Sequence, residues 1–147
     1  MAYISNTDIQ TRLGSAVYVQ LTDDAGTGSA NTAVVDEARA GAEGEVDAYL
    51  ARRFAVPIDL AANPEVGGIL KSIALDLAEY RLRLRRPPVS AEATSRRDSA
   101  VAWLTGVAEG RIRMPARVDP AAGTLDGPTG QATGAERIWT RDETSDF

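Results

Sequence analysis

The sequence predicts a mainly α-helical fold: a small bundle of about four helices, a short extended segment and a long irregular C-terminal tail. Two observations carry this prediction. Between residues 32 and 110, apolar residues recur at spacings of three and four, within stretches bounded by residues that start or stop helices. After Met114 the sequence is rich in Gly, Pro and Thr and shows no such periodicity.

The first helix is predicted at residues 5–14. A cluster of N-cap residues, Ser5 to Asp8, precedes Ile9 and Leu13, and Gly14 closes the stretch after about two turns. The apolar residues 16–21 follow. Residues 22–31 then form a loop rich in Gly, Ser, Asp and Thr.

The second helix is predicted from Thr32, which can cap it, to about residue 54, because the residue before Pro57 disfavours helix. Gly41 and Gly44 in its middle each cost roughly 1 kcal/mol relative to alanine. We interpret them as positions where another backbone approaches closely. The apolar face of this helix consists of Val35, Ala38, Ala42, Val46, Tyr49 and Leu50.

The third helix is predicted to begin at Asn63-Pro64, a strong start signal, and to end at Pro87-Pro88. The fourth helix spans residues 90–109, and residues 111–114 are predicted to be extended and able to add to a neighbour's sheet edge. The stripe of the third helix contains Val66, Ile69, Leu70, Ile73, Leu77, Tyr80, Arg81 and Leu84. The apolar set of the fourth helix is Ala100, Val101, Trp103, Leu104, Val107 and Ala108.

These elements divide the chain into a folded domain at residues 1–114 and an extended Gly/Pro/Thr-rich tail at residues 115–147. The composition of the tail cannot bury enough apolar surface to offset the entropy of ordering it. Ile138 and Trp139 interrupt this composition. We interpret the pair as a short docking peptide that anchors on another protein.

Composition excludes several classes of chemistry. The 147-residue chain has neither cysteine nor histidine, which removes Cys/His zinc sites and Ser–His or Cys–His catalytic pairs. Adjacent acids such as Asp23-Asp24 and Asp36-Glu37 are better explained by solvation and the helix dipole than by catalysis. No apolar run is long enough to span a membrane. We therefore expect a soluble protein, made in the cytoplasm, that is not an enzyme and uses no catalytic residues, metal or cofactor.

Charge is unevenly distributed along the chain. The net charge of −5 combines −6 in residues 1–70, +5 in residues 71–117 and −4 in residues 118–147. This pattern indicates either complementary surfaces of neighbouring subunits, as in a head-to-tail ring, or solvated helix faces. The candidate interface residues are Arg81, Arg83, Arg85, Arg86, Arg96, Arg97, Ile138 and Trp139.

The same arginines suggest an alternative function, a small Arg-rich nucleic-acid-binding regulator, in which they would neutralise phosphates. The acidic net charge weighs against this alternative. So does the lack of aromatic residues interleaved with the arginines, on which bases would stack.

The order of these features resembles the head–tail adaptor (connector) family of Mu-like bacteriophages, formerly a phage family of unknown function. The similarity covers residues 3–114. It begins with Tyr3-Ile4, Thr7-Asp8-Ile9, Arg12-Leu13-Gly14 and Gln20-Leu21-Thr22-Asp23. It continues with A-E-G-E-V-D-A-Y-L-A-R-R-F-A-V-P at residues 42–57, L-K-S-I-A-L-D-L-A-E-Y-R-L at 70–82 and A-W-L-T-G-V-A-E-G at 102–110.

The resemblance implies a structural adaptor that forms a ring, usually dodecameric, beneath the portal in the neck of the virion. It implies as partners the portal protein, neighbouring copies of the chain and a tail terminator or stopper protein. Genomic DNA would pass through without specific binding. In that setting residues 1–114 form the adaptor domain and the tail becomes ordered on assembly.

A lumen that passes DNA is expected to be acidic or neutral. The candidate acids of the lumen or of a subunit seam are Asp36, Glu37, Glu43 and Asp47. A virion or host-binding module outside the neck is a third possible role.

Overall fold

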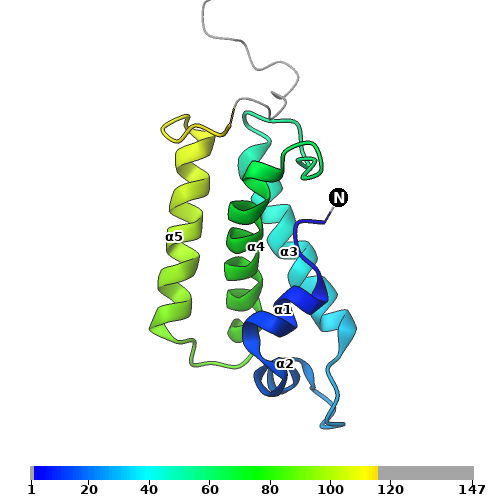
Figure 1. Ribbon diagram of the computed structural model, residues 1–147. Coiled ribbons are helices and arrows are strands. Elements are labelled where there is room, and N and C mark those ends of the chain that lie inside the picture. Colours follow the sequence, from blue (N-terminus) through cyan, green and yellow to red (C-terminus); the bar gives the residue numbers. More distant parts are fainter. Residues whose placement is uncertain (1, 116–147) are drawn as a thin grey trace, which may run out of the picture.

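The computed structural model describes residues 2–115, which form five helices and no strand (Figure 1). The predicted mainly α-helical fold is confirmed. The candidate residues Ile138 and Trp139 lie outside the described residues. The helices are α1 (Asn6–Leu13), α2 (Ser15–Thr22), α3 (Thr32–Leu50), α4 (Pro64–Leu84) and α5 (Ala91–Ala108).

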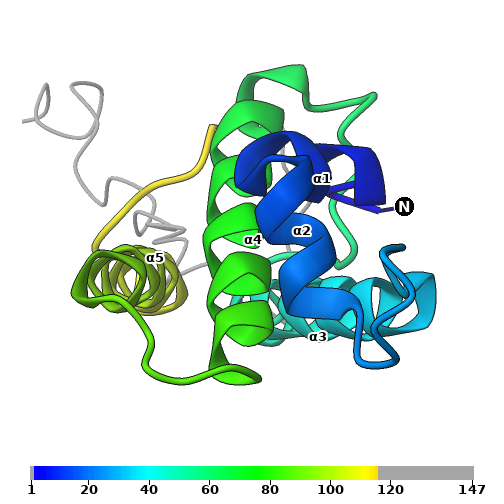
Figure 2. The same cartoon turned by 90° about the horizontal axis from the view of Figure 1, so that it is seen from below.

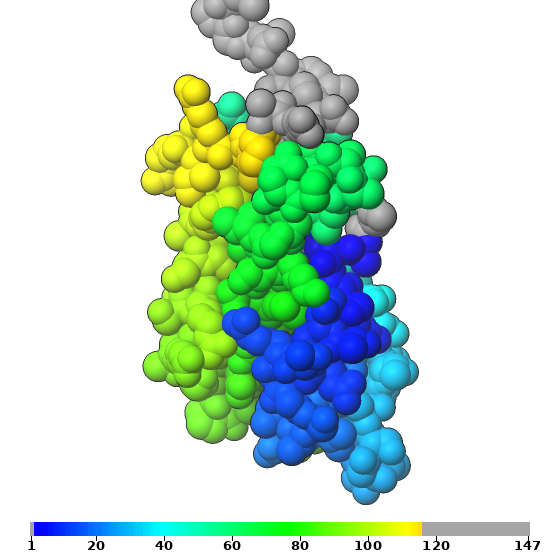
Figure 3. Space-filling model, in the orientation of Figure 1, coloured from blue at the N-terminus to red at the C-terminus, as the bar shows by residue number. Residues whose placement is uncertain are grey.

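The three long helices lie side by side, and α4 runs opposite to α3 and α5 (Figure 1). Seen from below, α4 stands at the centre, with α5 on one side and the short pair α1 and α2 on the other (Figure 2). The central helix contacts each of the other four. A strip of α4 reaches the surface between α5 and the α1–α2 pair (Figure 3). The sequence of α4 therefore decides how the whole bundle packs.

The short helices are joined through Gly14, which ends α1 and immediately precedes α2. Ser5 begins α1 with a capping box, in which its hydroxyl accepts from the Asp8 amide and the Asp8 carboxylate accepts from the Ser5 amide. The φ of 77° at Gly14 is a conformation that glycine adopts readily. Residues 16–21, for which the sequence predicts no element, are helical in the structure, with Tyr18 and Leu21 buried.

The predicted apolar face of α3 is correct, since five of its six members are buried and Tyr49 is partly buried. The predicted stripe of α4 is wrong at three positions: Arg81 is exposed, Ile69 is 40% exposed and Leu84 is 52% exposed. Because α4 is covered from several sides, its buried face widens to include Ala74, Ala78 and Leu82 in place of them.

The C-terminal end of α5 turns back on the bundle. Gly110, with a φ of 77°, follows the helix, and the Ile112 amide donates to the Gly106 carbonyl at 3.0 Å. A Cβ on Gly106 would lie 2.8 Å from Cδ1 of Ile112, so the Ile112 side chain would have to shift to admit one. Residues 111–114 are non-helical, as predicted, but they form this return rather than a strand. In the described part of the chain, no helix has the length and apolarity needed to cross a membrane.

Candidate functional site

The six arginines selected from the sequence all contact acidic groups or carbonyls of the same chain. They lie on the C-terminal half of α4, just after it, and on the first half of α5. The complementary segments of the sequence thus meet within one molecule. Whether these arginines also contact a second subunit stays a prediction.

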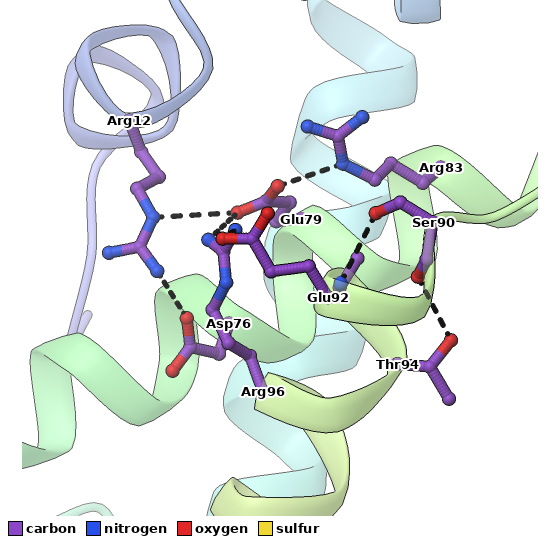
Figure 4. A network of polar contacts seen from close by, with 9 residues as sticks. Arg12, Asp76, Glu79, Arg83, Ser90, Glu92, Thr94 and Arg96 are labelled. Atoms are coloured by element: carbon purple, nitrogen blue, oxygen red, sulfur yellow. Dashed lines mark hydrogen bonds and ion pairs between the residues drawn. The ribbon is translucent and has the colours of Figure 1, made fainter.

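The most buried of these contacts form the Glu79 cluster, defined as Arg12, Asp76, Glu79, Arg83, Glu92 and Arg96 (Figure 4). The Glu79 carboxylate, from the buried face of α4, accepts from Nε of Arg83 at 2.8 Å and from Nη1 of Arg96 at 3.2 Å. Nε of Arg12, on α1, approaches it at 3.4 Å. One carboxylate thereby joins α1, α4 and α5.

The cluster is electrically balanced, and its central carboxylate is shielded from water. Its three arginines face three carboxylates, and the side chain of Glu79 is only 6% exposed. Burial raises the pKa of Asp76, while the nearby charges of Arg12 and Arg96 oppose that shift. A buried carboxylate is tolerated when its charge and lone pairs are satisfied in this way. We therefore assign the cluster to the stability of the bundle.

Arg81, Arg85 and Arg86 tie α4 to the acidic first half of the chain. Nη2 of Arg81 donates to Glu45 at 2.9 Å, and Arg85 binds the carboxylate of Asp24. Nη1 of Arg85 also donates to the Leu21 carbonyl, and Nη2 of Arg86 to the Asp23 carbonyl, each at 2.9 Å. These contacts fix the loop after α2 against the end of α4.

Gly41 makes room for Arg81. A Cβ at Gly41 would lie 2.9 Å from Nη1 of Arg81, whereas a Cβ at Gly44 would meet nothing within 4 Å. The interpretation of these glycines as points of backbone approach is therefore wrong. At Gly41 the neighbour is a side chain, and Gly44 has open space beside it.

Arg97 is held on α5 without reaching another helix through an ion pair. Its Nη1 donates to Asp98 at 3.1 Å, and its guanidinium lies 5.6 Å from the centre of the Tyr80 ring. This distance is within the range of a cation–π interaction. The contact places an aromatic ring of α4 beside the arginine of α5.

The four candidate acids of α3 do not share one environment. Asp36 accepts from Asn6, Glu43 accepts from the Ile4 amide at 3.0 Å, and the Tyr3 hydroxyl donates to Asp47. These three acids therefore bind the N-terminal segment. Within residues 2–115, Glu37 has no ion pair, and it is exposed. Their placement at a lumen or seam stays a prediction.

Tyr3 links the N-terminal segment to two distant parts of the chain, and it is not among the candidate residues predicted from the sequence. Besides donating to Asp47, its hydroxyl accepts from the Ile58 amide at 3.0 Å, and its side chain belongs to the core. Burial and the hydrogen bond to Asp47 raise its pKa well above the usual range. No local pattern could have found it, because its partners lie far along the chain.

Two surface grooves combine apolar and basic side chains. The Leu84 groove, about 270 Å³, lies between α3 and α4 and is lined by Val34, Glu37, Ala38, Arg81, Leu84 and Arg85. The exit groove, about 320 Å³, lies where the chain leaves α5 and is lined by Arg53, Phe54, Gly110, Ile112, Arg113 and Met114. Both volumes lie near the lower end of the range found for ligand pockets.

The arginines at the exit groove differ from those of the Glu79 cluster. Across the described residues, Arg52, Arg53 and Arg113 form no ion pair, although every other basic side chain there does. The guanidinium of Arg53 lies over Gly110, where a Cβ would be 2.0 Å from its Nη1. This end of the bundle therefore presents uncompensated positive charge beside an apolar groove.

Residues 2–115 contain no group of three or more acidic side chains arranged to hold a metal ion. The polar contacts that the structure does show are ion pairs, helix caps and hydrogen bonds between elements.

Comparison with known protein families gives a match over most of the chain. Residues 3–130 match the family described as "Bacteriophage Mu, Gp36". No curated protein matches the chain. The matched stretch includes all five helices, both grooves and the Glu79 cluster.

Proposed function

Because the chain belongs to the Bacteriophage Mu Gp36 family, we propose that it is a structural head–tail adaptor of a tailed bacteriophage. In this role it has no catalytic activity, and copies of the chain form a ring between the portal and the tail. Its partners are the portal protein, its own neighbouring copies and a tail terminator or stopper protein, and genomic DNA passes through the ring. The family match is the observation that carries this proposal.

The Leu84 groove is the surface that best suits a contact between subunits. Leu84 is an exposed large apolar side chain, flanked by Arg81 on the same helix and by Arg85, which directly follows the helix. Apolar contact bordered by arginine is typical of the energetic centre of an interface. The ion pairs of these two arginines are at the surface, so exchanging partners there costs little.

The environments of the four candidate acids differ, and we use this difference to choose among them for the predicted lumen or seam. Glu37 lies at the edge of the Leu84 groove and is free of ion pairs in the described region, whereas Glu43 and Asp47 are engaged by the N-terminal segment. Asp36 is likewise engaged, by Asn6 and Arg39, so we propose that Glu37 faces the seam between subunits. There it can meet the arginine of a neighbouring copy.

Location in the particle tests the proposed role. Purified particles are separated into heads and tails, and each fraction is blotted for the chain. We expect it with DNA-filled heads, in a small amount relative to the capsid protein. Absence of the chain from every particle would contradict an adaptor role.

Leu84→Asp tests the proposed interface, with Ile69→Asp as the matched control on the same helix. Both side chains are exposed, so both variants should remain folded by circular dichroism. We expect Leu84→Asp to abolish ring assembly seen by electron microscopy and sedimentation, and Ile69→Asp to retain it. If the two variants assemble equally well or fail equally, the Leu84 groove is not the contact between subunits.

The alternative role, an Arg-rich nucleic-acid-binding regulator, is tested by the salt dependence of duplex binding. Each phosphate contact contributes a slope of about −0.9 to the logarithmic plot. The intramolecular pairing of all six candidate arginines weighs against this role. A steep slope that is lost in the variant with Arg85→Ala and Arg86→Ala would favour it.

A further inference from the structure

The exit groove has the composition of a binding site for an acidic peptide with an apolar anchor. Phe54, Ile112 and Met114 supply apolar surface, and each is partly buried against the core. Arg53 and Arg113 line the same groove. An apolar floor beside two cations favours a ligand that carries a large apolar side chain followed by carboxylates.

Charge distinguishes this groove from the Leu84 groove. Arg81 and Arg85 already bind Glu45 and Asp24, whereas Arg53 and Arg113 have no carboxylate partner among residues 2–115. Bringing a carboxylate to the exit groove would therefore break no ion pair within residues 2–115.

The C-terminal sequence of the same chain has the matching chemistry. Ile138 and Trp139 form the only adjacent pair of large apolar residues after residue 115, and the acids Asp142, Glu143 and Asp146 follow them. We propose that the exit groove is occupied by residues 138–146 of its own chain. The apolar pair then lies on Phe54, Ile112 and Met114, and the acids lie beside Arg53 and Arg113.

The length and starting point of the chain support this occupant. Met114 itself lines the groove, so the C-terminal part of the sequence begins at the site. The residues from 116 to 137 can span at most about 75 Å when fully extended, which is ample for a return to their starting point. A segment attached so close to its site has an effective concentration in the millimolar range, far above that of a second copy in dilute solution.

The proposal differs from the sequence-based interpretation of Ile138 and Trp139 as an anchor on another protein. It does not depend on the adaptor role, because it concerns the isolated chain. If both hold, the docking peptide is held on its own body before assembly and must leave the exit groove to reach a partner.

Photochemical cross-linking of the full-length chain tests this occupant. Trp139→p-benzoylphenylalanine places a photoreactive group at the apolar anchor, and mass spectrometry of the irradiated protein identifies the attached residues. We expect attachment to residues 53–54 and 110–114. An equal mixture of unlabelled and ¹⁵N-labelled protein shows whether the two linked peptides come from one chain, which the proposal requires.

Charge reversal supplies the second arm of the test. Arg53→Glu and Arg113→Glu should each lower the cross-link yield by roughly two- to five-fold, as expected for the loss of an exposed ion pair. Arg39→Glu, an equal charge change at a half-buried arginine on α3, should leave the yield unchanged. Attachment elsewhere, no attachment, or pairs of mixed isotope composition would each overturn the proposal, the last in favour of a second copy.

Discussion

The two arginine-rich regions of this molecule differ in what surrounds their charges. In the Glu79 cluster, three arginines converge on one buried carboxylate and bind α1, α4 and α5 together. At the exit groove, Arg53 and Arg113 have no carboxylate partner in the described residues. The density of arginine along a sequence therefore does not reveal where positive charge is available to a partner.

The difference arises from where each region lies in the bundle. The first lies where three helices approach one another, so acids and arginines from distant segments come within bonding distance. The second lies at the end of the bundle, where α3 and α5 terminate and the chain turns. We therefore expect the first region to determine stability and the second to have little effect on it.

Removal of the Glu79 carboxylate should have the largest effect. Glu79→Ala leaves three arginines facing one another without their central partner and should lower the free energy of unfolding by about 3 kcal/mol. Glu92→Ala, which removes an exposed partner of Arg96, should cost less than about 0.5 kcal/mol. Urea unfolding followed by circular dichroism measures both. Equal losses of unfolding free energy in the two variants would mean that burial of the carboxylate does not determine its contribution to stability.

Acid should weaken the ion pair between Asp8 of α1 and Lys71 of α4, with a smaller effect on stability than the loss of Glu79. The hydrogen bond from Lys71, with those from Ser5, lowers the pKa of Asp8 to about 2. A carboxyl whose folded pKa lies below its unfolded value stabilises the fold above the unfolded pKa, and this stabilisation is lost as pH falls from about 4 towards 2.

Because the charges of Asp8 and Lys71 are accessible to solvent, we expect their contribution to be only about 1 kcal/mol. The measurement is the difference in unfolding free energy between the original chain and Asp8→Asn across this pH range. It should be largest near pH 6 and shrink towards pH 2. A difference that stayed constant with pH would show that the Asp8 charge has no part in stability.

The smallest effect should come from the exit groove. Arg113→Ala removes a charge that has no ion pair in the described residues and should change the free energy of unfolding by less than about 0.5 kcal/mol. Thermal and urea unfolding are both suitable measurements. A loss above about 1 kcal/mol would show that this arginine holds the fold together, and the contrast between the two regions would then fail.

The sequence predicted the features that depend on neighbouring residues. The start of α4 after Asn63, the N-cap of α5 at Ser90 and the stop at Gly110 are local signals, and the structure confirms them. It did not reveal α2, whose apolar run has no helical pattern of its own, or the exchange of Leu84 for Leu82 on the buried face.

The role of Glu79 was equally out of reach of the sequence. Its partners Arg12 and Arg96 lie 67 and 17 residues away, and only the packing of three helices brings them together. Arg83, the partner four residues along the same helix, was the one contact that spacing could have indicated. The sequence indicates the arginines as candidate residues but gives no sign that the Glu79 carboxylate lies between them.

The ion pairs between the two halves of the chain also bear on the order of events during synthesis. Arg81 and Arg85 bind acids that precede them by 36 and 61 residues. The first 70 residues, with a balance of −6, therefore leave the ribosome before the arginines that neutralise them exist. On the nascent chain, repulsion among these acids opposes compaction until α4 emerges. We therefore expect α3 to pack only after α4 has been synthesised.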